Sequence, residues 1–176
     1  GGAERSPEGG VGLGGGSAAR LGGWHDYGHR KRCHERDDVL GGASGDFFVL
    51  QGHGKGESCV MKFDRDGIFI TTWGKKGKAP GEFDLPHSIV VDAKGLLYIA
   101  DRNNARIQVF DADGSFIREM KTPGTPGGLY IRPDQPLYLA HGNGGELSKM
   151  DLDGNGRGAI GVEGAGVGRV RVRAVL

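Results

Sequence analysis

The sequence predicts an all-β fold, a β-propeller built of four-stranded antiparallel blades. Positions 84–121 hold four short apolar segments, separated by Lys94-Gly95, Asn103-Asn104 and Asp113-Gly114. Asn, Asp and Gly tolerate the backbone of tight hairpin turns, and the segments between them are rich in β-branched and aromatic residues that suit a pleated sheet. This stretch therefore predicts four strands in a meander.

The same unit recurs along the chain. An apolar segment followed by an Asp-x-Asp-Gly turn ends at Gly67, at Gly114 and at Gly154, which gives intervals of 47 and 40 residues. A period of about 40 to 50 residues carrying four strands is typical of propeller blades, whose sheets bury their faces against one another. The 176 residues leave room for only three or four such blades, so the predicted propeller is incomplete.

The repeat divides the chain into three predicted blades, at 33–80, 81–122 and 123–161. Each is expected to hold four strands, marked by apolar runs between turn signals. In chain order the predicted strands cover 38–40, 47–50, 59–64, 68–73, 88–92, 96–101, 106–111, 115–120, 129–131, 137–141, 146–151 and 157–160.

The two ends do not follow the repeat. Glycine accounts for 36 residues and is concentrated there, so we expect 1–32 to be a disordered glycine-rich end and leave 162–176 unassigned. The ends resemble the translation of GC-rich DNA in a wrong reading frame. A truncated or frame-disrupted product without activity is therefore one hypothesis for this chain.

Charge and composition exclude several classes of partner. The net charge is +1, with 23 basic and 22 acidic residues, and gives no global field for nucleic acid. No run reaches the roughly 18 to 20 apolar residues of a membrane span, and no signal peptide is visible. The compartment therefore stays unassigned. Cys33 and Cys59 make no disulfide framework and are expected to be buried or free thiols.

Three weaker motifs have simpler explanations. His25, His29 and His34 are close in sequence, but the glycines among them argue against the helix that would bring the first two onto one face. The segment 151–156 opens like a calcium loop but lacks the glutamate at its twelfth position, and it is also a turn of the repeat. The segment 54–56 lacks the spacing of a phosphate-binding loop.

The second blade carries two recognisable sets of residues. The first set runs through its strands and turns: Pro86, Ile89, Val91, Asp92, Gly95, Tyr98, Ile99, Ala100, Asp101, Asn104, Arg106, Ile107, Gln108, Val109, Phe110 and Asp111. The second set is Gly-Glu-Phe at 81–83, Leu-Pro-His-Ser at 85–88 and Ala-Asp-Arg at 100–102. The first set resembles an NHL repeat, and the second resembles the peptidyl-α-hydroxyglycine α-amidating lyase family and its bacterial relatives. The resemblance covers about 37–161.

The resemblance implies a six-bladed propeller with zinc in its central channel, held by three histidines from alternate blades. It also implies a lyase that splits a peptidyl-hydroxyglycine into a peptide amide and glyoxylate, and it allows an extracytoplasmic location. Carried over to this chain, His87 falls on a zinc-ligand position and Arg102 on an arginine that meets the substrate. His53 stands where the family has a tyrosine near the metal, so His53 and Arg102 are the candidate catalytic residues.

Each candidate also has a structural interpretation. His87 could line the channel and bond to the neighbouring blade, whereas Arg102 could pair with a nearby acid. His53 and His141 lie in predicted turns, where a solvated histidine is the simplest expectation. Arg106 and Asp101 are predicted to form a structural ion pair between adjacent strands.

Two functions remain open from the sequence. One is the zinc-dependent lyase, and the other is a non-catalytic propeller that binds a peptide or protein on its loop face. Open blade edges expose unpaired backbone groups, so we also expect self-association of the chain.

Overall fold

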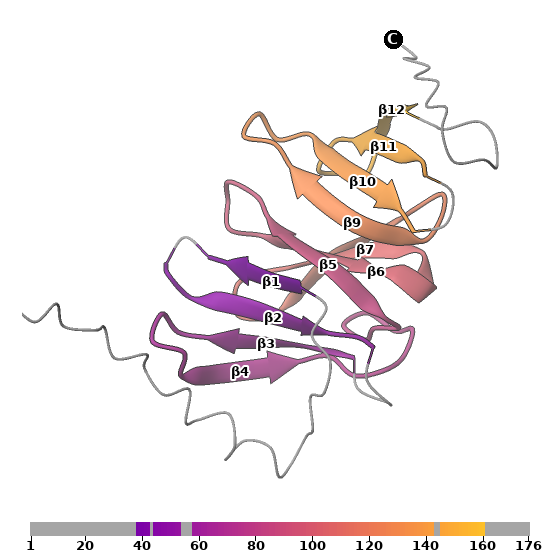
Figure 1. Ribbon diagram of the computed structural model, residues 1–176. Helices are drawn as coiled ribbons and strands as arrows, with labels where there is room; N and C mark the ends of the chain where they lie inside the picture. Colours follow the sequence, from indigo (N-terminus) through magenta and orange to yellow (C-terminus); the bar gives the residue numbers. More distant parts are fainter. Residues whose placement is uncertain (1–37, 43, 54–57, 143–144, 161–176) are drawn as a thin grey trace, which may run out of the picture.

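The computed structural model describes residues 38–42, 44–53, 58–142 and 145–160, which form three antiparallel sheets of four strands (Figure 1). The predicted fold class, an incomplete propeller of four-stranded blades, is confirmed. The strands are β1 (Asp38–Gly41), β2 (Phe47–Gln51), β3 (Cys59–Phe63), β4 (Phe69–Trp73), β5 (Pro86–Val91), β6 (Leu97–Asp101), β7 (Arg106–Phe110), β8 (Phe116–Lys121), β9 (Pro126–Ile131), β10 (Leu137–His141), β11 (Leu147–Met150) and β12 (Gly156–Ile160).

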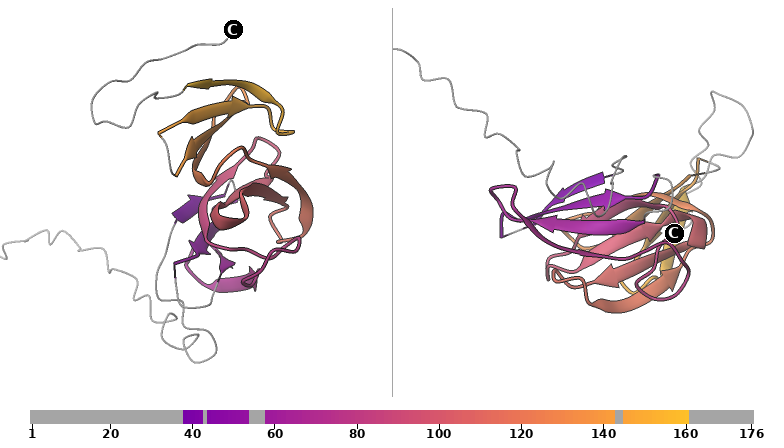
Figure 2. Two further views of the ribbon diagram at one scale, coloured as in Figure 1. Left: turned by 90° about the vertical axis from the view of Figure 1, so that its right-hand side faces the viewer. Right: turned by 90° about the horizontal axis from the view of Figure 1, so that it is seen from below.

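The sheets stack on one another in chain order. We call β1–β4 blade 1, β5–β8 blade 2 and β9–β12 blade 3, and within each blade the strands lie side by side in sequence order. Strand β5 contacts both β1 and β9, so the first strands of the three blades are neighbours. Figures 1 and 2 show blade 2 between the other two. One face of blade 1 and one face of blade 3 therefore lack a neighbouring blade among the described residues.

The predicted strands match the observed ones closely, with two differences. Strand β9 begins at Pro126, three residues before the expected start. Proline has no backbone N–H to donate to the neighbouring strand, but it is tolerated at the first position of a strand. The predicted turn at Asn103-Asn104 is a 3₁₀ helix, Arg102–Asn104, which ends in a left-handed Ala105 with φ of 49°. The predicted ends at 1–32 and 162–176 lie outside the described residues.

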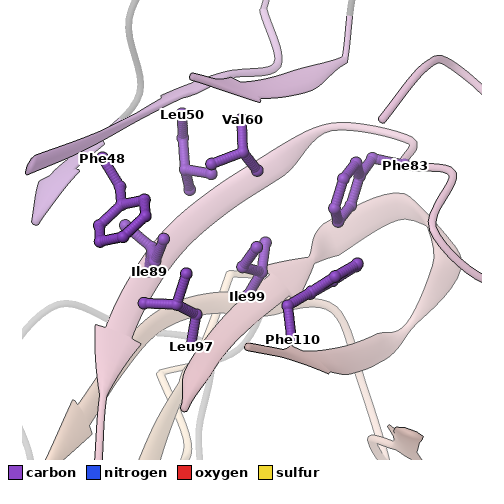
Figure 3. Packing of buried hydrophobic residues seen from close by; sticks show 8 residues of the cluster. All are labelled: Phe48, Leu50, Val60, Phe83, Ile89, Leu97, Ile99 and Phe110. Carbon is purple, nitrogen blue, oxygen red and sulfur yellow. The ribbon is translucent and has the colours of Figure 1, made fainter. Parts of the chain in front are cut away.

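The core between blades 1 and 2 is a sandwich of apolar side chains (Figure 3). Alternate residues of a strand point to opposite faces of its sheet, so each blade gives one set of side chains to this layer. Phe83, on the connection between the blades, is fully buried in the same cluster. The buried members are Phe48, Leu50, Val60, Phe83, Ile89, Leu97, Ile99 and Phe110.

Blade 2 uses its opposite face to pack against blade 3. The second cluster combines aliphatic side chains with one tyrosine and two methionines, and it is also buried. Because both faces of blade 2 are covered, all residues of its strands β6 and β7 are buried. The buried members are Tyr98, Ile107, Val109, Met120, Leu137, Leu139 and Met150.

The Asp-x-Asp-Gly turns share one backbone arrangement. The first aspartate accepts hydrogen bonds from the N–H groups two and four residues later, and the glycine adopts a positive φ between 82° and 90°. Such side-chain bonds satisfy the turn without a bound ion. The carboxylate of Asp151 accepts these bonds from its own turn, so 151–156 contains the repeat turn that the sequence predicts.

The turn aspartates make the stability of the fold depend on pH. Backbone N–H groups, first that of Ser115, hold the pKa of Asp111 below its ordinary value of 3.8. A carboxyl whose pKa is lowered by folding stabilises the fold above its unfolded pKa, and this contribution disappears as the pH falls through the folded pKa. In Asp111→Asn the amide oxygen accepts the same bonds but does not titrate in this range.

We therefore expect the advantage of the wild type over Asp111→Asn to be constant above about pH 5 and to shrink below about pH 4. Urea unfolding of both proteins between pH 3 and 7 measures it. The other carboxyl groups are common to both proteins and cancel in the difference. A difference that stays the same down to pH 3 would show that Asp111 has an ordinary pKa.

The predicted structural pair of Arg106 and Asp101 is confirmed. Arg106 Nε lies 2.7 Å from Asp101 Oδ2, and both side chains are buried. The other guanidinium nitrogens of Arg106 bond to Glu119 and to the carbonyls of Lys78, Ala79 and Glu82, so all five N–H donors are used. This arginine joins blade 2 to the connection that arrives from blade 1.

Composition led to two further expectations that the structure addresses. Cys59 is buried, and its Sγ lies 3.6 Å from Gln51 Oε1, whereas Cys33 lies outside the described residues. Within the described part of the chain, no helix has both the length and the apolar character needed to cross a membrane.

Candidate functional site

The candidate residues gather at one rim of the three blades. His53 follows β2, Arg102 follows β6, and His141 ends β10, so each lies at the end of the second strand of its blade. His87 belongs to β5, whose first residue pairs with the last residue of β6. We call His53, His87, Arg102 and His141 the histidine rim. The repeat brings these residues to the same end of the stack.

His87 is a half-buried residue that reaches the next blade. The register between β5 and β6 shifts between Pro86 and Ser88, and His87 lies at this irregularity. Its Nδ1 lies 2.6 Å from the carbonyl oxygen of Gly127, which occupies the corresponding position of blade 3. A carbonyl only accepts, so Nδ1 carries a hydrogen, and in the neutral ring Nε2 is then the nitrogen with the lone pair. The expected bond to a neighbouring blade is therefore present.

His53 lies beside His87. The two ring centroids are 5.5 Å apart and the rings meet edge to face at 66°. His53 is exposed, as expected for a turn residue, but its ring is packed rather than fully solvated. The structure therefore brings together the two histidines that the sequence proposed as metal ligand and as catalytic group.

Arg102 makes no ion pair with any residue in the described part of the chain. Asp101 is instead taken by Arg106. The guanidinium group of Arg102 lies against the backbone of Gly142, where an added Cβ would be 3.0 Å from Nε and Nη2. The backbone N–H of Arg102 donates to the carbonyl oxygen of Leu85 at 3.2 Å, which connects Arg102 to the residue just before β5.

Two glycines of blade 3 support both His87 and Arg102. His87 bonds to Gly127, Arg102 lies on Gly142, and an added Cβ at Gly127 would lie 3.2 Å from the Gly142 backbone. These two residues were not among the predicted site residues. A signal existed, because Gly127 and Gly142 occupy in blade 3 the positions of His87 and Arg102. A glycine at the repeated position makes room for the larger side chain of the preceding blade.

His141 is not the solvated turn residue that the sequence favoured. It is half-buried, and its Nε2 lies 2.8 Å from the hydroxyl oxygen of Ser148, which is itself buried. An added Cβ on Gly124 would lie 2.8 Å from its Nδ1, so the ring is packed on the backbone there. His141 therefore has a structural role within blade 3.

The rim does not contain a complete metal site in the part of the chain that the structure describes. No group of three or more His, Cys, Asp or Glu side chains there could hold an ion. His87 and His53 are two potential metal ligands whose rings are in contact, with centroids 5.5 Å apart. His53, His87 and Arg102 lie at the same end of the stack.

Comparison with known proteins relates this architecture to its family. The NHL repeat profile matches residues 83–110, which run from Phe83 to the end of β7 and include His87, Arg102 and Arg106. The chain contains an NHL repeat. The chain is also similar to curated proteins of animals.

One such relative is peptidyl-glycine alpha-amidating monooxygenase A of Xenopus laevis, 38% identical over 123 residues, which are 60% of this chain and 13% of that protein. Another is NHL repeat-containing protein 3 of Homo sapiens, 37% identical over 70 residues, which are 40% of this chain and 20% of that protein. The chain thus spans a small part of the length of these relatives. The predicted NHL repeat and the predicted resemblance to the amidating enzymes are both confirmed.

The fold is also found in solved structures. Virginiamycin B lyase from Staphylococcus aureus superposes with a TM-score of 0.61, over 76% of this chain and 43% of that chain, at 14% identity. At this identity the likeness concerns the fold alone. It supports the description of the chain as a partial propeller.

Proposed function

We propose that this chain is part of a zinc-dependent NHL propeller of the peptidyl-hydroxyglycine amidating type, with the histidine rim as the substrate end. The homology to amidating monooxygenases over 60% of the chain supports the proposal. Within the rim, His87 would provide a metal ligand, and Arg102 would bind the carboxylate of the substrate.

The observation that carries the proposal is the hydrogen bond of His87. Histidines that bind metals almost always donate their second ring N–H to a carbonyl, a carboxylate or a water, which fixes the ring and its tautomer. The 2.6 Å contact between His87 Nδ1 and Gly127 O has this form. It leaves Nε2 as the basic nitrogen, so the bond to the neighbouring blade is compatible with ligation.

The described residues fit one position of a zinc site and not the whole. A catalytic zinc takes about three protein ligands and keeps one position open. The described part of the chain has no group of three ligands. A complete site therefore needs further ligands, from outside these residues or from another chain.

Arg102 has the properties of a carboxylate-binding residue. A guanidinium group presents its donors in a planar fork that matches a carboxylate, and it keeps its charge at any relevant pH. Arg102 is half-buried, forms no ion pair with a described residue, and is held by Leu85 and Gly142. This role fits a substrate that ends in a carboxylate.

Zinc content of the purified full chain tests the proposal. We expect zinc to bind the wild type, to be lost in His87→Ala, and to remain in His141→Ala, because His141 is engaged with Ser148. Release of glyoxylate from a peptidyl-hydroxyglycine would then be measured on the zinc-loaded protein. Equal zinc content in the wild type and His87→Ala would contradict the role of His87.

A second candidate is a non-catalytic binding propeller. The missing third ligand among the described residues favours it. It predicts no zinc in either protein, together with binding of a peptide ligand at the loop face. The same measurement therefore separates the two candidates.

A further inference from the structure

The blades are joined by an ion pair that repeats from one junction to the next. Between blades 1 and 2, Lys62 Nζ lies 3.2 Å from Asp113 Oδ1. Between blades 2 and 3, Arg118 Nη2 lies 3.5 Å from Asp153 Oδ1. Asp113 and Asp153 hold the same position of the Asp-x-Asp-Gly turn. At each junction, a cation of one blade thus meets the turn aspartate of the next.

The cation is placed in the same way in both blades. Lys62 Nζ lies 5.9 Å from the ring centroid of Phe48, and the Arg118 guanidinium lies 5.7 Å from that of Tyr98. Phe48 and Tyr98 are each the second residue of the second strand of their blade. Arg118 pairs across the sheet with Val109, which is the repeat equivalent of Lys62. An aromatic ring therefore supports the cation that points to the next blade.

Blade 3 has this arrangement, but no blade follows it among the described residues. Lys149 is the repeat equivalent of Lys62, and its Nζ lies 6.0 Å from the ring of Tyr138, the second residue of β10. No carboxylate in the described segments lies within ion-pair distance of Lys149. The face also exposes 58% of Tyr130, whose equivalent Val90 packs against the second core cluster.

Blade 1 carries the complementary half of a junction. Asp66 is the equivalent of Asp113 and Asp153; it is exposed, and its carboxylate makes no ion pair with any described residue. The same blade exposes 59% of Val39, whose equivalent Ile89 is only 3% exposed at the junction of blades 1 and 2. Blade 1 thus presents an acidic turn and an apolar residue at the positions that a preceding blade would cover.

We propose that two copies of this chain pair through these faces, with Lys149 of each copy against Asp66 of the other. The pairing would reproduce the junctions already present within the chain, namely a cation on an aromatic ring, a turn aspartate and apolar side chains. It differs from edge-to-edge strand pairing, because it joins the faces of blades. The occupant of each open face is a second copy of this chain.

A two-fold pair leaves no face uncovered. Its two junctions are identical by symmetry, so both Lys149 residues and both Asp66 residues are used. The three described blades of each copy would together make a ring of six, within the range of four to eight that propellers use. An unclosed series of end-to-end contacts would instead give filaments of no fixed size.

Sedimentation equilibrium of the full chain tests this pairing. We expect a wild-type mass of about twice the 18.6 kDa of one chain. Lys149→Asp and Asp66→Lys should each place like charges at both junctions and raise the dissociation constant at least ~10-fold. Lys94→Asp, at an exposed turn of blade 2, is the matched control and should leave the mass unchanged.

Mixing the two single variants provides the sharper readout. In a mixed pair, one junction joins the two substituted positions, which now carry opposite charges in reversed order, and the other joins the native Lys149 and Asp66. Dimers should therefore return when the two proteins are combined. The double variant should also dimerise. A monomeric wild type at high concentration would overturn the pairing, and so would growth beyond the dimer or a mixture that stays monomeric.

Discussion

Replacing Arg106 with methionine is expected to lower the free energy of unfolding by about 3–5 kcal/mol, the usual cost of removing one partner of a buried ion pair. Methionine retains most of the apolar length of the side chain but none of its donors. The substitution leaves Asp101 buried without its cation, and it frees the carbonyls of Lys78, Ala79 and Glu82 from their shared donor. Urea unfolding at pH 7 measures the loss.

The loss should depend on pH in a defined direction. Burial raises the pKa of the Asp101 carboxyl, and hydrogen bonds from Asn104, Asp84 N–H and Arg106 oppose that rise. Without Arg106 the pKa of Asp101 rises further. The loss of stability in the variant is therefore largest at the pH values where Asp101 must be charged. As the pH falls toward about 5, protonation should recover part of the loss.

The matched control is the double variant Arg106→Met with Asp101→Asn. It removes the buried charge as well as its partner, and we expect it to be more stable at pH 7 than Arg106→Met alone. If the double variant were less stable than the single one, the unpaired Asp101 charge would not be the source of the loss.

The same pair explains why blade 2 was easier to predict than its neighbours. At the positions of Asp101 and Arg106, blade 1 has Gln51 and Cys59, and Gln51 Nε2 is buried without a hydrogen-bond partner among the described residues. Blade 3 has His141 and Glu146, joined there through the backbone. The strands persist in all three blades because the apolar alternation persists, although the polar motif does not.

The candidate site was predictable only where one residue carries the signal. His87 and Arg102 follow from a local motif: Arg102 opens the 3₁₀ helix after β6, and His87 lies at the register shift near the start of β5. The residues that contact them, Gly127 and Gly142, belong to another blade about 40 residues away. Because they are glycines, no side chain indicates a functional role in the sequence. Such contacts depend on how the blades stack, which a pattern within one blade does not contain.

Replacing Gly114 with alanine is expected to cost about 2–5 kcal/mol. The glycine has φ of 88°, and an added Cβ would lie 2.6 Å from Trp73, which packs against Phe110 with centroids 6.2 Å apart. A left-handed alanine costs roughly 1–2 kcal/mol, and overpacking adds about 1–3 kcal/mol. The rigid indole cannot move away without disturbing the core between blades 1 and 2.

Gly95→Ala is the matched control, because Gly95 has φ of 82° in a turn with nothing within 4 Å of its added Cβ. It should lose only the roughly 1–2 kcal/mol of backbone strain. Gly154→Ala should fall between the two, since its Cβ would meet the flexible Met120 at 2.9 Å, in the position that Trp73 holds in blade 1. Urea midpoints of the three variants measure this order. Equal losses would mean that the turn glycines serve the backbone alone, whereas the graded order would show that they set how closely successive blades stack.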